Sequence, residues 1–318
     1  MNVLIIGGAG MIGSALASQL LSRGGINVSI YDLPEKIFVM KKFIGGVSWI
    51  EGSILEYTKL RDACRRKDAV FHLAAMLGVG RTESDPLGCL EINYMGTKNV
   101  LDAAMNRSVK KFIFASSSEV YGVPLENPID ENARLDARTV YATSKLAGEH
   151  LVRGYHKTGE AMTYTIVRFF NTYGPYQVAK FAVSKFILDA HRDRKIIING
   201  SGQQSRSYCF SSDIAEGLIK ILHSESADNQ ILNLGNPDAR ITLNELCQKI
   251  ISKLSFEVSI VHTDQGSMVD RSADREIYTR YCNIDKARKL LGFNPTIDID
   301  VGLNQIIDGG RLFEKWHI

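Results

Sequence analysis

The stretch "GGAGMIG" at residues 7–13 directly follows the apolar run "NVLII" at residues 2–6 and opens an amphipathic segment. Between a strand and a helix, glycines allow a tight turn, close approach of the backbone to a pyrophosphate, and close helix packing. A second apolar run, residues 27–31, leads to Asp32, 19 residues after Gly13. A carboxylate there accepts the hydroxyls of an adenosine ribose and repels a 2′-phosphate. The glycines alone also fit a turn without a ligand, but together with Asp32 they predict a site for NAD in preference to NADP.

Strands and helices alternate through the first half of the chain. Short β-branched and apolar runs predict strands, and the longer amphipathic stretches between them predict helices. The expected strands are residues 2–6, 27–31, 47–50, 68–73, 110–115 and 164–169, and the expected helices are residues 11–23, 56–66, 86–107 and 139–158. This order is typical of an α/β fold with a Rossmann-type doubly wound parallel sheet, which binds ligands at the carboxyl ends of its strands.

After residue 170 the pattern loosens into loops and separate helices, expected near residues 212–223, 242–253 and 285–292. We therefore expect two parts. Residues 1–170 would form the NAD-binding Rossmann domain, and residues 171–318 a smaller mixed α/β C-terminal lobe that binds the substrate, with chain segments crossing between the two.

Composition narrows the class of function. The 318 residues include 38 basic and 35 acidic side chains interspersed along the chain, a net charge of +3, so we expect no nucleic-acid partner. Five scattered cysteines without CxxC spacing, and seven histidines without an HExxH pattern, argue against disulfides and against a metal site and favour the cytoplasm. No apolar run approaches the roughly 18 residues of a membrane span, so we expect no membrane association.

Two later motifs carry groups suited to proton transfer. "FASSSEVYG", residues 114–122, leaves the fifth strand with three hydroxyls and a carboxylate, and "YATSK", residues 141–145, opens the following helix. Tyr141 and Lys145 are four residues apart and therefore share one helical face. A phenol with an ordinary pKa of about 10 needs a neighbouring cation to act as a base at neutral pH, and Lys145 is placed to supply it.

In this order, the motifs resemble the extended short-chain dehydrogenase/reductase family, in particular its nucleotide-sugar epimerases, dehydratases and decarboxylases. The resemblance runs along almost the whole chain and also includes "HLAA" at 72–75, "NYMGT" at 93–97, "NTYGP" at 171–175, "GSGQQSRSYCFSSD" at 200–213 and "RYCNIDKARKLLGF" at 280–293. It implies NAD as cofactor, a nucleotide-diphosphate sugar as substrate, and a homodimer formed through helices 86–107 and 139–158.

The resemblance also implies roles for single residues. Tyr141 would be the general base, Lys145 would hold the ribose and acidify Tyr141, and Ser117 would bind the sugar hydroxyl that is oxidised. Ser118 and Glu119 would lie beside this group, and a purely structural role for Glu119 stays open. The cofactor would contact Tyr141, Lys145, Gly7, Gly10, Met11, Ile12, Gly13, Asp32, Ser53, Ile54, Leu73, Ala74, Ala75 and Asn93. The nucleotide diphosphate would contact Asn171, Arg206 and Arg280.

One position departs from the family pattern for the cofactor. Relatives commonly have Gly-Asp-hydrophobic after the third strand, where this chain has Gly52, Ser53 and Ile54. A serine hydroxyl still offers a hydrogen bond, so NAD remains the expected cofactor.

Several reactions follow from one first step, the transient oxidation of the sugar C4 hydroxyl. A 4-epimerase of an NDP-hexose, most of all a UDP-sugar, needs the fewest additional groups and is placed first; residues 74–86 are also similar to C4 epimerases. A UDP-glucuronate decarboxylase that forms UDP-xylose is the alternative, because residues 117–122 and 231–246 are similar to that group.

Three other functions are less favoured. A 4,6-dehydratase usually carries an Asp where this chain has Ser118. A keto-sugar reductase usually prefers NADPH, which Asp32 disfavours. A catalytically silent NAD-binding module would have no chemical need for the complete Ser117, Tyr141 and Lys145 set.

Overall fold

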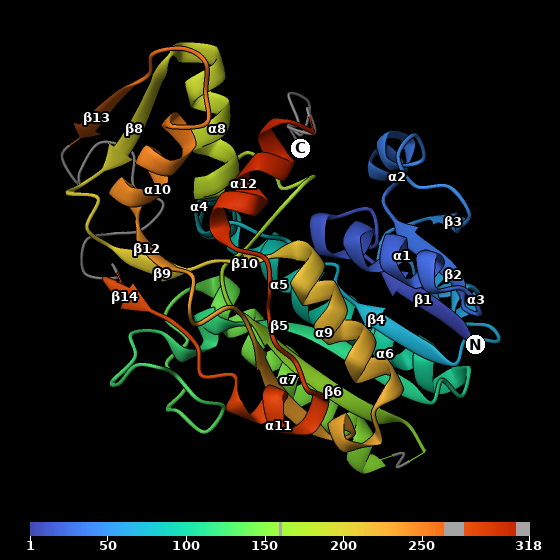
Figure 1. The fold of residues 1–318 in the computed structure, drawn as a ribbon. Helices are drawn as coiled ribbons and strands as arrows, with labels where there is room; N and C mark the ends of the chain where they lie inside the picture. Colours follow the sequence, from blue (N-terminus) through green and yellow to red (C-terminus); the bar gives the residue numbers. More distant parts are fainter. Residues whose placement is uncertain (159–160, 264–276, 310–318) are drawn as a thin grey trace.

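A seven-stranded parallel sheet forms the centre of the computed structural model, which describes residues 1–158, 161–263 and 277–309. Its strands run in the order β11-β6-β5-β4-β1-β2-β3 (Figure 1). In chain order they are β1 (Asn2–Ile6), β2 (Asn27–Asp32), β3 (Ser48–Glu51), β4 (Ala69–His72), β5 (Lys111–Ser117), β6 (Thr163–Phe169) and β11 (Gln230–Leu234). The strand order reverses between β1 and β4, the switch point at which doubly wound sheets bind ligands. The predicted Rossmann-type fold is confirmed.

Helices cover both faces of this sheet, and each face has its own apolar cluster. One face carries α1 (Met11–Arg23), α9 (Ser211–His223) and α11 (Asp285–Leu291). The other carries α3 (Tyr57–Ala63), α6 (Gly96–Asn106) and α7 (Val140–Thr158). Strand β1 has no polar side chain from Val3 to Ile6, and these residues are fully buried, because a central parallel strand is covered on both sides.

The helix expected at residues 86–107 is present in three consecutive parts. It begins as α5 (Pro86–Leu90), continues as a π-helical turn at Glu91–Met95, and ends as α6. Asn93 lies in this turn, and its carbonyl accepts a hydrogen bond from the Thr97 hydroxyl at 2.5 Å. The π-helical turn is thus continuous with α5 and α6, and residues 86–106 remain helical throughout.

The chain after residue 170 contributes to both parts of the molecule. The smaller mixed lobe has its own apolar core. It contains β7 (Thr172–Tyr173), α8 (Ala182–Asp193), β8 (Lys195–Asn199), β9 (Ser205–Ser207), β10 (Cys209–Phe210), β12 (Arg240–Thr242), α10 (Leu243–Ile251), β13 (Ser259–Thr263), β14 (Thr279–Arg280) and α12 (Ile299–Ile307). Between these elements the chain returns to the central sheet, where β11 pairs with β6 and α9 packs on α1. The chain therefore crosses between the two parts (Figure 1).

Candidate active site

The turn from β1 into α1 contains glycines that packing requires, among them Gly7 and Gly13, and one that packing does not explain. Gly7 has a φ of +83°, and a Cβ there would lie 2.5 Å from the Ala74 nitrogen. A Cβ on Gly13 would lie 2.5 Å from the Gly8 Cα. A Cβ on Gly10, the residue before α1, would meet only the Gly7 carbonyl at 3.4 Å, an ordinary contact. The loop thus leaves an open approach to the positive end of α1, which fits the pyrophosphate of a dinucleotide.

Asp32 ends β2 and is buried beside this loop. Its Oδ2 accepts a hydrogen bond from the Ala9 nitrogen at 2.9 Å, and its Oδ1 accepts one from the Leu33 nitrogen at 2.8 Å. Burial raises the pKa of Asp32, while the charge of Lys36 and the two backbone N–H groups act against this shift. The carboxylate therefore fixes the shape of the glycine loop and retains lone pairs that fit the hydroxyls of a ribose.

Ser53 and Ile54 follow β3. The Ser53 hydroxyl accepts a hydrogen bond from the Leu55 nitrogen at 3.2 Å, and the Ser53 carbonyl accepts one from the Tyr31 hydroxyl at 2.8 Å. Ile54 is buried, and its side chain occupies the space beside Gly96. These contacts shape the loop after β3, and a contact of either side chain with the cofactor stays a prediction.

The segment after β4 crosses the glycine loop. The backbone nitrogens of Leu73 and Ala74 both donate to the Ile6 carbonyl, at 2.8 and 3.0 Å. The remaining expected cofactor residues of this region are half-buried: Met11, Ile12 and Ala75.

Asn93 holds the segment after β4 against α7. Its Oδ1 accepts a hydrogen bond from the Met76 nitrogen at 2.7 Å, and its Nδ2 donates to the Ser144 hydroxyl at 3.0 Å. The side chain is buried. Its observed contacts are therefore with the protein, and its expected contact with the cofactor stays a prediction.

Ser117, Tyr141 and Lys145 come together where β5 ends and α7 begins. The Lys145 Nζ donates to the Ala115 carbonyl at 2.8 Å and lies 6.0 Å from the centre of the Tyr141 ring. The Ser117 hydroxyl lies near enough to Tyr141 to lower the pKa of its phenol. The Ser117 hydroxyl also accepts a hydrogen bond from the Glu119 nitrogen at 3.2 Å, which starts a 3₁₀ turn at Ser118–Tyr121.

Burial controls the protonation of both groups on α7. It raises the pKa of the Tyr141 phenol, and the Ser117 hydroxyl acts against that shift. It lowers the pKa of Lys145 to about 8, against the opposing influence of Cys89 and Glu149. Lys145 is therefore mostly protonated at neutral pH, and its charge beside Tyr141 favours the phenolate.

Glu119 is held by an arginine of the C-terminal lobe. The Arg280 Nη2 donates to the Glu119 Oε1 at 2.6 Å, and the two side chains are 4% and 12% exposed. Among the described residues, Nε and Nη1 of Arg280 have no hydrogen-bond partner. Arg280 pairs in register with Arg206 of the neighbouring parallel strand β9. Two guanidinium groups on adjacent strands fit an anionic ligand.

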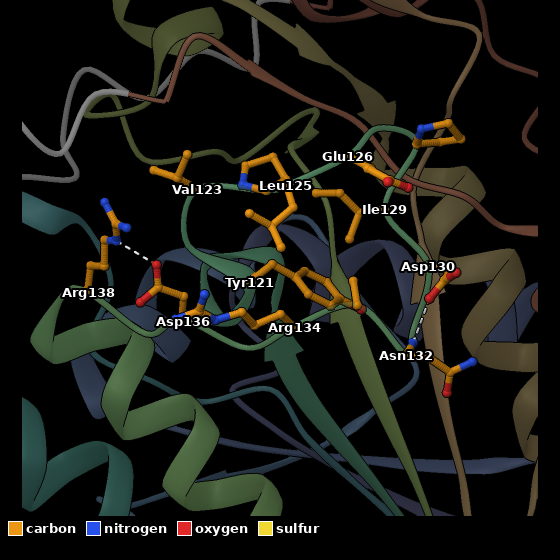
Figure 2. Close-up of a pocket in the computed structure, with 13 residues that line it drawn as sticks. Tyr121, Val123, Leu125, Glu126, Ile129, Asp130, Asn132, Arg134, Asp136 and Arg138 are labelled. Carbon is orange, nitrogen blue, oxygen red and sulfur yellow. Dashed lines mark hydrogen bonds and ion pairs between the residues drawn. The ribbon is translucent and has the colours of Figure 1, made fainter.

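The loop between the 3₁₀ turn and α7 links this turn to β14. The Asn127 Nδ2 donates to the Thr279 carbonyl at 3.3 Å, and its Oδ1 accepts from the Tyr281 nitrogen at 3.2 Å. The same loop and Tyr121 line a hollow of about 380 Å³, in which Arg138 points to Asp136 (Figure 2). The loop is therefore hydrogen-bonded to Thr279 and Tyr281, the residues on either side of Arg280.

Asn171 follows β6, beside the lobe strands. Its carbonyl accepts a hydrogen bond from the Cys209 nitrogen at 2.9 Å, which ties the end of β6 to β10. Contacts of Asn171, Arg206 and Arg280 with a nucleotide diphosphate stay predictions.

Sequence reasoning missed two groups that support α7. Glu149 of α7 forms a buried ion pair with Arg168 of β6, at 2.7 Å. Glu83 of α4 (Val79–Ser84) accepts a hydrogen bond from the Val140 nitrogen at 2.9 Å, at the first residue of α7. A signal for the first group was present, because Glu149 lies four residues after Lys145 and Arg168 is the only charged residue of β6.

In the part of the chain that the structure describes, no group of three or more His, Cys, Asp and Glu side chains is arranged to hold a metal ion. No helix in the same ranges is both long and apolar enough to cross a membrane. All five cysteines are buried free thiols.

The fold and the site define a dinucleotide-binding enzyme with a Ser-Tyr-Lys group at the end of the central sheet. Residues 3–235 match the model of the NAD dependent epimerase/dehydratase family. The chain belongs to this family, which confirms the family expected from the motifs and identifies the chain as an enzyme that uses NAD.

Individual relatives include both expected activities. The UDP-N-acetyl-alpha-D-glucosaminuronate decarboxylase of Bacillus cytotoxicus is 33% identical, over 98% of this chain and 98% of the relative. The structure of the UDP-glucuronic acid 4-epimerase of Bacillus cereus, in complex with UDP-glucuronic acid and NAD, has a TM-score of 0.86 and 27% identity, over 97% of this chain and 98% of that chain. The UDP-glucose 4-epimerase of Thermotoga maritima with UDP-glucose has a TM-score of 0.84 and 25% identity, over 98% and 99%. These relatives support the epimerase and the decarboxylase alike.

Because the approach to Gly10 is open, a methyl group added there should obstruct the cofactor without disturbing the packing of the protein. Gly10→Ala meets no internal clash, so we expect unchanged stability and an NAD affinity lower by about tenfold or more, equivalent to roughly 1.4 kcal/mol. Isothermal titration of cofactor-free protein and denaturant unfolding measure the two quantities.

Gly13→Ala is the matched control. Its Cβ would clash with the Gly8 backbone, so it should lower the free energy of unfolding by about 1–3 kcal/mol. Equal NAD affinity of Gly10→Ala and the wild type would contradict a pyrophosphate site at this loop.

Proposed function

We propose that this enzyme oxidises C4 of a UDP-uronate and then releases the sugar carboxylate as carbon dioxide. The observation that carries the proposal is Arg280, a buried guanidinium with two unpartnered nitrogens among the described residues. Arg280 holds Glu119, whose backbone nitrogen donates to the Ser117 hydroxyl at 3.2 Å, so the guanidinium lies on the side of the site where Ser117 ends β5. The family resemblance assigns Arg280 to the nucleotide diphosphate; in this proposal Arg206 keeps that role, and Arg280 binds the carboxylate that a uronate carries on C5, next to C4.

The side chains at the end of β5 have complementary roles in this proposal. Tyr141 takes the proton of the C4 hydroxyl, which Ser117 orients by a hydrogen bond. Lys145 favours the phenolate and binds the cofactor ribose. NAD bound at the glycine loop supplies a hydride acceptor for C4 and a hydride donor at the end of the reaction.

Loss of the carboxylate follows from the chemistry of the oxidised sugar. A ketone at C4 places the C6 carboxylate in the β position, so the C5–C6 bond breaks with its electron pair entering an enolate at C4 and C5. Carbon dioxide leaves, and a proton adds to C5. Arg280 binds the carboxylate before this step, together with Glu119 as its fixed counter-charge.

Epimerisation at C4 is the second candidate. The Ser117, Tyr141 and Lys145 group suffices for it without any further acid or base, and the Bacillus cereus relative is an epimerase bound to a UDP-uronate. In that case the carboxylate is retained, and the ketone is reduced from the opposite face.

A panel of UDP-sugars separates these reactions. Purified enzyme is incubated with UDP-glucuronate, UDP-N-acetylglucosaminuronate or UDP-glucose and followed by NMR and carbon dioxide release. We expect turnover of a UDP-uronate to a UDP-pentose with one carbon dioxide per product, because Arg280 needs an anion. Retention of the carboxylate in a 4-epimer supports the second candidate, and turnover of UDP-glucose alone contradicts the role of Arg280.

Tyr141→Phe is the control for the chemistry. It removes one hydroxyl and leaves the ring in place, so it should lose most turnover, by about 10²–10⁴-fold, and keep its bound NAD. Activity like that of the wild type would exclude Tyr141 as the base.

We also propose that the enzyme is a homodimer. An apolar strip on α5 and the π-helical turn supports this, because its side chains face solvent at helical spacing: Leu87 (79% exposed), Leu90 (38%), Tyr94 (36%) and Met95 (45%). Contiguous apolar surface of this kind marks a protein contact.

A charge in this strip tests the dimer. Leu87→Asp should give a monomer in sedimentation velocity, because it buries a carboxylate in the contact. Phe38→Asp, on the exposed side of α2 (Pro34–Met40), is the control and should leave the mass unchanged. A wild-type monomer would contradict the proposal.

We further propose the cytoplasm as the location and the division at residue 170 as the functional boundary. Five buried free thiols support a reducing compartment. The separate apolar core of the lobe supports a nucleotide-sugar part within residues 171–318, with residues 1–170 binding NAD.

A further inference from the structure

A buried ion pair lies behind the proposed catalytic group. Nε and Nη2 of Arg168 donate to Oε1 and Oε2 of Glu149, at 2.9 and 2.7 Å. The side chains are 2% and 4% exposed. Glu149 lies one helical turn after Lys145 on α7, and Arg168 lies on β6, so the pair joins the helix to the sheet.

Residues 117–121, the Ser117 turn, are hydrogen-bonded to this pair near both ends. The Ser116 hydroxyl donates to the Glu149 Oε1 at 2.5 Å, and Ser116 directly precedes Ser117. At the far end of the turn, the Tyr121 hydroxyl accepts a hydrogen bond from the Arg168 Nη1 at 3.0 Å. The Tyr121 hydroxyl in turn donates to the Asn233 Oδ1 of β11, at 2.7 Å.

Stability alone does not explain two buried charges here. Well-packed apolar residues of similar volume often replace a buried ion pair without loss of stability, whereas loss of one partner leaves an uncompensated charge. A charged pair is suited to a purpose that needs a fixed geometry or a fixed charge.

We propose that Glu149 and Arg168 are positioning residues that hold the Ser117 turn against the helix carrying Tyr141 and Lys145, and that Glu149 supplies the fixed negative charge facing Lys145. The inference rests on the proposed function, in which Lys145 must be protonated to support Tyr141. It deepens that function, because it names the groups that keep the cation in place.

The other groups around Lys145 are uncharged at neutral pH. On β4, burial lowers the pKa of His72 to about 3, so the imidazole is neutral. On α5, burial raises the pKa of the Cys89 thiol, and on α7 it raises that of Tyr141. Glu149 is therefore the anion that favours the protonated form of Lys145.

The direct test is the titration of Lys145 itself, which needs no turnover. Protein labelled with ¹³C-lysine is titrated by NMR, and the Lys145 Cε signal is assigned by its loss in Lys145→Met. In Glu149→Gln the midpoint should fall by about one pH unit from the wild-type value near 8, because removing a nearby negative charge favours the neutral amine. An unchanged midpoint in Glu149→Gln overturns the inference.

Three matched variants separate charge from packing. Glu149→Leu with Arg168→Leu removes both charges, and its midpoint should return toward the wild-type value. Ser116→Ala breaks the link to the turn without changing a charge, so it should leave the midpoint unchanged and lower kcat at unchanged KM. Glu149→Asp keeps the charge but withdraws it by one methylene, so its midpoint should lie between those of the wild type and Glu149→Gln. It carries the test if Glu149→Gln does not fold.

The pH profile of turnover gives a second readout with a definite sign. Lys145 loses its proton above its midpoint, so activity should decline on the alkaline side, and in Glu149→Gln that decline should begin at lower pH. A lowered midpoint in an enzyme that turns over no UDP-sugar would support the positioning role and contradict the proposed function. An unchanged midpoint in an enzyme that turns over a UDP-sugar would contradict the positioning role and support the proposed function.

Discussion

A buried ammonium group sets the layout of the active site. Lys145 is fixed to the Ala115 carbonyl near the end of β5, and through this bond α7 is docked at the carboxyl end of the sheet. Tyr141 lies one turn before it on the helix, and Ser117 lies two residues after Ala115 on the strand. The three groups proposed for proton transfer therefore lie where the Lys145–Ala115 and Ser116–Glu149 hydrogen bonds join α7 to β5.

Burial at this position affects the protonation of Lys145 and of Tyr141, and two ion pairs lie beside them. Burial lowers the pKa of Lys145 to about 8 and raises that of Tyr141, so both groups are shifted toward their neutral forms. Glu149 opposes this shift at Lys145. Among the described residues, the second buried ion pair at the site joins Glu119 to Arg280 and brings the lobe to the serine turn. The Glu149–Arg168 pair thus joins α7 to β6, and the Glu119–Arg280 pair joins the 3₁₀ turn to β14 of the lobe.

The sequence predicted the parts of the structure that are local. Apolar runs located six strands of the central sheet to within one or two residues at each end, because a buried parallel strand needs apolar side chains on both faces, whereas the seventh strand, β11, was not expected. The glycine spacing located the tight turn between β1 and α1, where the pyrophosphate is expected, because a Cβ at Gly7 or Gly13 would clash with the backbone. The helix expected at residues 86–107 is present as α5, the π-helical turn at Glu91–Met95 and α6, and the sequence pattern did not indicate the π-helical turn.

Local sequence patterns could not predict the contacts between residues far apart in the chain. Arg280 meets Glu119 across 161 residues of sequence, and no local pattern states which arginine of the lobe reaches the serine turn. Arg168 and Glu149 were missed because a charged residue in a strand or a helix usually faces solvent, whereas these two are buried against each other. The sequence therefore located the reactive groups, and the structure was needed to find the charges that hold them.

The central claim is that the hydrogen on C4 of the sugar leaves as a hydride and returns within the same active site. It is tested most directly with a UDP-sugar that carries deuterium at C4, converted in ordinary water and analysed by NMR. We predict that the deuterium stays at C4 of the product, because a hydride held in the site does not exchange with water. Loss of the deuterium to water would show that C4 is deprotonated instead and would contradict the claim.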